Sequence, residues 1–186
     1  MRRNVGHSNV EDELLRIIRF AGAMMMLVVS GAIAFAEDGV DPAAVKSEEG
    51  KYLDKEGNPT FNVAADGTVD WYTYSGYRRY HSECHVCHGP DGMGSTYAPG
   101  LTDSLKTMSY ADFLGVVASG RKNVSSSQDN VMPAFGDNPN VSCYMDDLYV
   151  YLRARANNAL GRVRPAKHEA KSDAYIQAEN SCMGTR

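Results

Sequence analysis

The hydrophobic pattern of residues 1–36 differs from that of the rest of the chain. Arg16 and Arg19 precede an uncharged, largely apolar run over residues 20–36, which ends in Ala34-Phe35-Ala36. Basic residues, an apolar centre and a small-x-small ending are typical of a secretory signal peptide, and we expect cleavage after residue 36. The alternative is a retained membrane anchor, because the apolar run approaches the roughly 20 residues that a membrane-spanning helix needs.

The segment 37–74 is predicted to be an N-terminal extension with short strands. Residues 37–50 are polar and show no periodicity, which indicates a loose leader. Apolar and aromatic residues then flank two turn sequences, Glu56-Gly57-Asn58-Pro59 and Ala65-Asp66-Gly67. Short apolar stretches separated by turns predict a small hairpin or meander.

Three main helices are predicted in the segment 75–156. The first covers residues 75–86, with its first residue, a serine, as the cap. The second opens at the capping box Ser109-Tyr110-Ala111-Asp112 and ends at Gly120. The third covers residues 141–156 and has the clearest helical spacing of apolar residues.

Composition and loop length narrow the possible functions. The chain of 186 residues has a net charge of −4 and no basic block, which argues against binding to nucleic acid. Loops are predicted over residues 89–100 and 121–140, and a polar tail follows over residues 157–186. Loops of that length are uncommon in a compact domain, so they need something besides their own side chains to pack on.

The sequence Cys84-His85-Val86-Cys87-His88 points to a bound group that the loops can cover. Cys-x-x-Cys-His is the attachment motif of c-type haem. Two thiols three residues apart on a helical turn reach the two vinyl groups of one macrocycle, and the adjacent His88 points at the iron. We therefore predict one covalent haem c, attached through Cys84 and Cys87, whereas His85 is expected to be an exposed helix residue.

Two other interpretations of the cysteines are weaker. A thioredoxin-like redox pair would need Cys-x-x-Cys beside a parallel strand–helix–strand pattern, which the sequence does not have. A zinc site would need a second pair of ligands at matching spacing, but the remaining Cys143 and Cys182 lie far apart along the chain. Haem attachment remains the favoured interpretation.

The sixth iron ligand decides the kind of function. Histidine, methionine or an open position would indicate low potential, high potential or catalysis, respectively. Met93 is too close to His88 to reach the other face of the ring, and Met108 and Met145 adjoin or lie within predicted helices. Met132 lies in an irregular loop and is followed by a proline, which fixes the backbone. We predict Met132 as the ligand.

Three further residues are candidates for the haem pocket. A ligating histidine usually donates its second ring nitrogen to a carbonyl, and the carbonyl of Pro99 is the candidate acceptor. Leu101 is expected to pack on the ring; in the alternative interpretation, both are ordinary loop residues. Arg121 follows the middle helix and is a candidate to face a haem propionate, an interpretation no better supported than a solvated arginine.

The order of these motifs resembles class I cytochrome c. The resemblance rests on Cys84-His85-Val86-Cys87-His88-Gly89, Ala98-Pro99-Gly100-Leu101 and Met132-Pro133, and it covers roughly residues 75–155. It implies a mainly α fold in which the first and last helices cross, with a middle helix and one haem whose edge is exposed for electron transfer. It also implies the roles given above for His88, Pro99 and Met132.

Most of the chain beyond residue 36 is similar to the methanol-metabolism-related c-type cytochromes, and more distantly to cytochrome cL. The similar runs are Asp66-Gly67-Thr68-Val69-Asp70-Trp71-Tyr72-Thr73-Tyr74, Arg78-Arg79-Tyr80-His81, Val131 to Gly136, Tyr149-Val150-Tyr151-Leu152-Arg153-Ala154-Arg155 and Arg164-Pro165-Ala166-Lys167. Cytochrome cL can carry calcium near the haem, but no oxygen-rich loop marks such a site here.

This resemblance implies a periplasmic, single-haem, one-electron carrier rather than an enzyme. A quinoprotein methanol or alcohol dehydrogenase is the implied donor, and another cytochrome or a terminal oxidase is the implied acceptor. We expect a monomer that forms small, transient complexes. The alternatives are a haem enzyme whose methionine ligand dissociates, and a tightly bound electron-transfer subunit of a periplasmic dehydrogenase.

Cys143 and Cys182 remain once two cysteines are assigned to haem. In the exported part of the chain, such a pair most simply forms one disulfide. The bond would tether the tail, residues 157–186, to the start of the last predicted helix. Two free thiols are the alternative.

Overall fold

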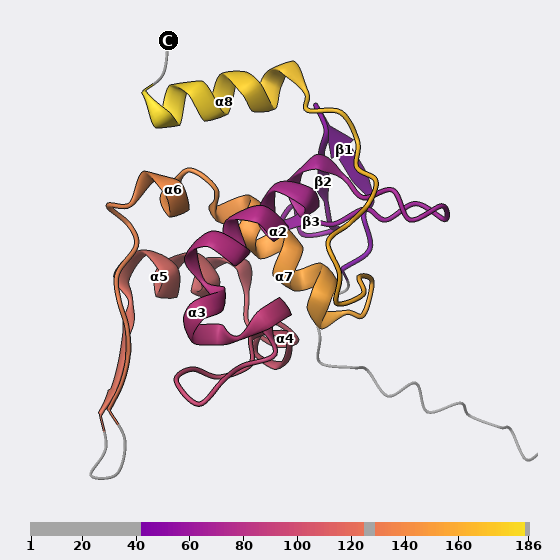
Figure 1. Ribbon diagram of the computed structural model, residues 1–186. Helices are drawn as coiled ribbons and strands as arrows, with labels where there is room; N and C mark the ends of the chain where they lie inside the picture. The colour runs from indigo at the N-terminus through magenta and orange to yellow at the C-terminus, as the bar shows by residue number, and fades with distance from the viewer. Residues whose placement is uncertain (1–41, 125–128, 185–186) are drawn as a thin grey trace, which may run out of the picture. The chain divides into compact units, whose positions relative to one another are not determined.

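The computed structural model describes residues 42–124 and 129–184, and it is mainly helical with short antiparallel strands (Figure 1). The predicted signal peptide lies outside the described residues. The helices are α2 (Trp71–Glu83), α3 (His85–His88), the 3-10 turn η1 (Pro90–Gly92), α4 (Leu101–Ser104), α5 (Tyr110–Ser119), α6 (Pro139–Ser142), α7 (Met145–Ala156) and α8 (Asp173–Met183). The strands are β1 (Lys46–Glu48), β2 (Lys51–Leu53), β3 (Pro59–Thr60), β4 (Arg121–Val124) and β5 (Asp129–Met132). Within these ranges, no helix combines the length and the apolar character needed to cross a membrane.

The first main helix begins earlier than the sequence predicts. Asp70 caps α2, because its carboxylate accepts a hydrogen bond from the backbone N–H of Thr73. Trp71 and Tyr72, which we expected in a strand, therefore form the first helical turn. The predicted cap Ser75 lies inside the helix. The N-cap Asp70 therefore outweighs the strand preference of the two aromatic residues that follow it.

Helices α2 and α7 cross at the centre of the fold, as the resemblance implied (Figure 1). Gly76 marks the crossing, since a Cβ at this position would lie 1.9 Å from the carbonyl oxygen of Asp147. Tyr80 on α2 and Leu148 and Leu152 on α7 are almost fully buried beside it. Only glycine allows the two backbones to approach this closely.

The N-terminal strands form a three-stranded antiparallel meander in the order β1-β2-β3. The expected hairpin is present, but the prediction of a loose leader is wrong for residues 46–48, which pair with β2. The meander is joined to α7 by a buried ion pair, in which Arg153 Nη1 lies 2.8 Å from Asp54 Oδ2. The same carboxylate accepts the backbone N–H groups of Glu56 and Asn58, so it also fixes the turn between β2 and β3.

The middle helix matches the prediction, whereas the loop after it does not. Ser109 caps α5 by accepting the N–H of Asp112, and Gly120 ends it. Residues 121–124 and 129–132 then form an antiparallel hairpin that extends away from α5 (Figure 1). Gly120 permits this, because a Cβ there would lie 2.6 Å from the carbonyl oxygen of Met132. The polar sequence of these strands gave no alternating pattern to predict them.

The last predicted helix is divided, and the C-terminal tail contains a helix that the sequence did not predict. The segment 141–156 is split between α6 and α7. Ser172 caps α8, whose Tyr175 is buried. The predicted disulfide is present: Cys143 and Cys182 are bonded, with their Cα atoms 5.7 Å apart. It joins α8 to the chain just before α7.

Candidate haem site

The two cysteines of the attachment motif lie where α2 gives way to α3. Cys84 ends α2 and precedes α3, and Cys87 lies one helical turn further on. Neither forms a disulfide; Cys84 is partly buried and Cys87 is exposed. Burial, with a smaller contribution from the charge of Glu83, raises the pKa of the Cys84 thiol to about 12. The reactive cysteine of a redox pair has a lowered pKa, so this environment argues further against a thioredoxin-like function.

The imidazole of His88 is held by the carbonyl predicted from the sequence. His88 is buried, and its Nδ1 lies 3.0 Å from the carbonyl oxygen of Pro99. An acceptor at that position fixes the tautomer in which Nδ1 carries the hydrogen. The other ring nitrogen, Nε2, then keeps its lone pair and is able to bind a metal ion.

Close backbone packing brings this carbonyl to the histidine. The N–H of Gly94 donates to the carbonyl of His88 over 2.7 Å. Gly89 has φ +73°, and a Cβ there would lie 2.1 Å from the carbonyl oxygen of Gly94. A Cβ on Gly94 would lie 2.7 Å from the backbone nitrogen of Gly100. The glycines of the loop therefore set the position of the acceptor.

Tyr80 is a part of this site that the sequence analysis did not identify. Its side chain is completely buried, and its hydroxyl donates to the carbonyl of Gly89 over 2.5 Å. The same hydroxyl accepts the N–H of Gly92 over 2.9 Å. The sequence did carry a signal for this role, because Tyr80 lies on the same helix face as Cys84. A tyrosine buried there needs a hydrogen-bond partner for its hydroxyl.

Met132 lies at the end of β5, on a different part of the chain from His88. It is half-buried and packs against the core, as does Leu101 at the start of α4. The strand register pairs Met132 with Arg121, whose side chain is exposed. The candidate ligand and the candidate propionate partner are therefore neighbours, which the prediction of an irregular loop did not indicate.

His85 differs from its prediction. We expected an exposed helix residue, but the side chain is partly buried and its ring stacks on that of His81, with the centroids 5.9 Å apart. The Nδ1 atom of His85 is buried and has no hydrogen-bond partner within the part of the chain that the structure describes. The junction of α2 and α3 places the two histidines one turn apart.

Comparison with known proteins identifies the family of the chain. No family model matches the chain. Cytochrome c-555 from Methylococcus capsulatus is 38% identical over 98 residues, which are 52% of this chain and 73% of that protein. The chain belongs to the c-type cytochromes.

Two further c-type cytochromes are similar over most of the chain. Cytochrome c-553I from Paracoccus denitrificans is 54% identical over 146 residues, or 78% of this chain. The match spans 65% of the length of that protein, slightly less than two thirds. The crystal structure of the c-type cytochrome XoxG from Methylobacterium extorquens AM1 is 60% identical, with a TM-score of 0.71 over 76% of this chain and 86% of that one.

Haem c is covalently bound in c-type cytochromes, and the residues of this chain fit such a group. The motif offers two cysteines without disulfide partners and a histidine whose Nδ1 is already engaged. Half-buried apolar side chains also pack against the core, and apolar contacts are what a macrocycle requires. They include Leu101, Met108, Leu114, Met132 and Phe135.

Proposed function

We propose that this cytochrome is a periplasmic one-electron carrier with a single haem bound to Cys84 and Cys87 and ligated by His88 and Met132. The observation that carries the proposal is the hydrogen bond between His88 Nδ1 and the carbonyl of Pro99, on a one-turn Cys-x-x-Cys-His helix. That contact orients the imidazole and leaves Nε2 for iron. The apolar run over residues 20–36 supports export.

The chain's own residues then restrict the chemistry to electron transfer. Haem c supplies the ferric–ferrous couple. His88 and Met132 would both bind the iron, which would leave oxygen and peroxide no open coordination site. A thioether favours ferrous iron, and His/Met ligation therefore raises the reduction potential. Arg121, opposite Met132 in the β4–β5 register, would pair with a propionate.

The proposed donor is a periplasmic quinoprotein dehydrogenase that oxidises methanol or another alcohol. Support comes from the sequence resemblance and from relatives found in methylotrophs. The proposed acceptor is another cytochrome or a terminal oxidase. Such a carrier exchanges partners rapidly, which suits a monomer and a small, transient interface.

The test is stopped-flow reduction of the purified ferric holoprotein by quinoprotein methanol and alcohol dehydrogenases, each supplied with its alcohol. We expect a fast rise of the ferrous haem bands that depends on the alcohol and saturates with dehydrogenase concentration. The control is the same reaction with a nicotinamide-dependent alcohol dehydrogenase, which should give no rapid phase. Equal rates with all of these enzymes, or none with the quinoproteins, would contradict the proposed donor class.

Size-exclusion chromatography of a periplasmic extract tests the mode of association. A free carrier elutes near its monomer mass, and its haem absorbance is separate from the dehydrogenase activity. Co-elution of both at high ionic strength would instead indicate a tightly bound subunit.

A further inference from the structure

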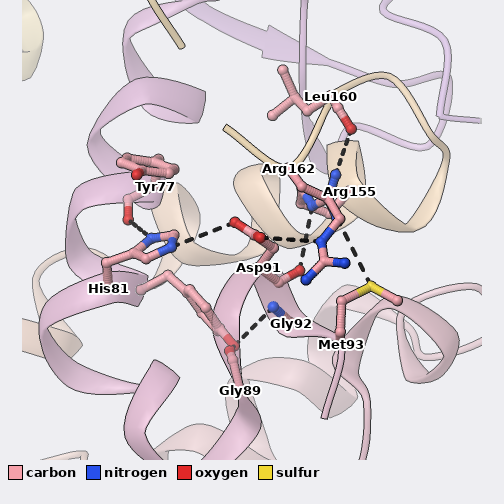
Figure 2. A network of polar contacts seen from close by, with 10 residues as sticks. Tyr77, His81, Gly89, Asp91, Gly92, Met93, Arg155, Leu160 and Arg162 are labelled. Carbon is pink, nitrogen blue, oxygen red and sulfur yellow. Dashed lines mark hydrogen bonds and ion pairs between the residues drawn. The ribbon is translucent and has the colours of Figure 1, made fainter. Parts of the chain in front are cut away.

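A buried polar network with Asp91 at its centre adjoins the attachment motif along the chain (Figure 2). Asp91 is 6% exposed, and one carboxylate oxygen lies 3.5 Å from Nε2 of His81. The other carboxylate oxygen lies 3.4 Å from Nε of Arg162. Its backbone carbonyl accepts a hydrogen bond from Nε of Arg155 over 3.3 Å. One aspartate thus links α2, η1, α7 and the segment after α7.

The backbone of Asp91 belongs to the turn that positions the proximal ligand. Asp91 is three residues beyond His88 and adopts φ +59°, a left-handed conformation that is uncommon for a residue other than glycine. The hydroxyl of Tyr80 bonds to Gly89 and Gly92 on either side of it. The contacts of the Asp91 side chain therefore act on the turn that directly follows His88.

His81 lies between two hydrogen-bond acceptors of the network. Its Nδ1 lies 2.8 Å from the carbonyl oxygen of Tyr77, which is an acceptor, so Nδ1 carries a hydrogen. Its Nε2 faces a second acceptor, the Asp91 carboxylate. A neutral imidazole would turn a lone pair toward that carboxylate, whereas the imidazolium turns an N–H toward it and pairs with its charge. The geometry suits the protonated ring.

The two nearby arginines leave the negative charge of the Asp91 carboxylate available to His81. Arg155 is buried, and its hydrogen bonds go to the carbonyls of Asp91 and Leu160 and to the thioether of Met93. The Arg162 side chain is largely exposed, which weakens its pairing with Asp91. The aromatic and titratable side chains that face His81 itself are Tyr77 and Tyr80 on α2, His85 on α3, Asp91 on η1 and Tyr151 on α7.

We propose that His81, facing Asp91, is a proton site coupled to the haem iron, so that reduction of the cytochrome favours protonation of this histidine. One electron from a donor or mediator would reduce the bound haem, and one proton from the bulk solvent would bind His81 Nε2, so that the added charges balance. This proposal rests on the proposed function, because it assumes a haem at Cys84.

The coupling is electrostatic and acts over a short distance. His81 and Cys84 are three residues apart at the end of α2, which separates them by roughly 4.5 Å along the helix axis. Oxidised iron carries one more positive charge than reduced iron, and this charge opposes the proton on His81. His81 and Cys84 are both partly buried, so screening of their interaction is weaker than at the surface.

The test is the midpoint potential of the purified holoprotein as a function of pH, measured with chemical mediators and no dehydrogenase. Histidine ordinarily changes charge between about pH 5 and pH 8, so the potential should fall as the pH rises through this range. His81→Gln should remove this dependence. Asp91→Asn should raise the potential at neutral pH and weaken the dependence, because a nearby negative charge is lost.

His168→Gln is the matched control. His168 is an exposed histidine that stacks on Tyr74, near the other end of α2, and its removal should leave the pH dependence intact. NMR of ring-labelled histidines in the wild type gives a second measurement that needs no variant. The His81 signals should titrate at higher pH in the ferrous than in the ferric protein.

A pH dependence in His81→Gln equal to that of the wild type would overturn the proposal, as would a wild-type potential that does not vary with pH. Identical titration of His81 in the two oxidation states would also overturn it. Because mediators replace the dehydrogenase, these results are independent of whether a quinoprotein is the donor.

Discussion

At the scale of single residues, two buried tyrosines on facing helices differ in one respect that can be tested. Tyr80 is 0% exposed and makes two hydrogen bonds to the turn after His88. Tyr151 is 1% exposed, and its hydroxyl has no hydrogen-bond partner among the described residues. The same substitution, tyrosine to phenylalanine, should therefore have different consequences at the two positions.

Tyr80→Phe leaves a buried carbonyl and a buried N–H without partners, so we expect the free energy of unfolding to fall by about 2 kcal/mol. Tyr151→Phe removes only an unpaired hydroxyl, and we expect no loss, or a small gain, in that free energy. Urea unfolding of the two holoproteins, followed by haem absorbance, measures both. Equal destabilisation by the two changes would contradict the assigned role of Tyr80.

The axial ligand is the next residue-scale prediction. Met132→Ala should lower the reduction potential, abolish the far-red absorption band of methionine bound to ferric iron, and allow carbon monoxide to bind the ferrous protein. Met93→Leu is the control, since Met93 is half-exposed and lies only five residues beyond His88. Prompt binding of carbon monoxide by the wild type would instead favour a haem enzyme with a labile ligand.

The sequence predicted those parts of the site that depend on local spacing. The attachment motif and the Pro99 carbonyl are close to His88 along the chain, so their geometry follows from a helical turn and one short loop. Tyr80 was missed because its partners are backbone groups of a turn with positive φ angles. Such a turn depends on glycines at positions whose importance becomes visible only when the backbones are packed. Asp91 was missed because its side-chain partners, His81 and Arg162, lie on other elements.

At the scale of elements, two helical glycines offer a matched comparison. Gly76 lies in α2 against the backbone of α7, whereas a Cβ on Gly115 in α5 would meet no atom within 4 Å. Gly76→Ala should therefore destabilise the protein by about 3 kcal/mol, because the added methyl group forces the helices apart. Gly115→Ala should stabilise it by about 0.5 to 1 kcal/mol, the difference in helix propensity. Chemical denaturation measures the free energy of unfolding of both variants. A Gly76→Ala protein as stable as the wild type would contradict the close approach of α2 and α7.

The disulfide gives a second stability prediction at the scale of elements. Cys143 and Cys182 are 39 residues apart in sequence, and closing a loop of that length stabilises a fold by about 4 kcal/mol in the chain-entropy account. The double change Cys143→Ser, Cys182→Ser should lower the free energy of unfolding by about that amount while haem stays attached through the other pair. Reduced wild type should match the variant. A loss of covalent haem in the variant would contradict the pairing.

Elements with strong local signals were predicted, and elements stabilised by distant contacts were not. The helix α5 has a capping box at one end and Gly120 at the other. The hairpin of β4 and β5 has few apolar residues, and its position depends on the close approach of Gly120 to the backbone of Met132. The helix α8 has a serine cap, but one buried tyrosine and a disulfide hold it against the rest.

At the scale of the whole molecule, polar contacts between distant residues fasten the N-terminal strands to α7 and to the segment before α8. Lys51 bonds to Asp146 over 2.6 Å, and the hydroxyl of Tyr52 bonds to Glu169 over 2.8 Å. The buried pair of Arg153 and Asp54 joins the meander to α7. The motifs therefore predicted the fold class, but no local pattern identifies which charged residues meet across such separations.

Asp147 joins three helices, and its burial makes the stability of the molecule depend on pH. It lies on α7, accepts a hydrogen bond from Tyr175 on α8, and is close to Ser75 on α2. Burial raises the pKa of this carboxyl to about 7, although the hydrogen bonds from Ser75 and Tyr175 oppose the shift. The unfolded chain releases the same proton near pH 4.

Between about pH 4 and pH 7, the folded protein therefore holds a proton that the unfolded chain has lost. The free energy of unfolding contributed by Asp147 must fall as the pH rises through this window, by about 4 kcal/mol in total. Asp147→Asn cannot titrate, so its advantage over the wild type should be absent near pH 4 and grow toward pH 7. Burial also raises the pKa of Asp70, but this contribution is common to both proteins and cancels in the difference. Urea unfolding of the two holoproteins at pH 4 to 8 measures that difference, and a value that stays constant with pH would mean that Asp147 is already ionised in the folded protein below pH 4.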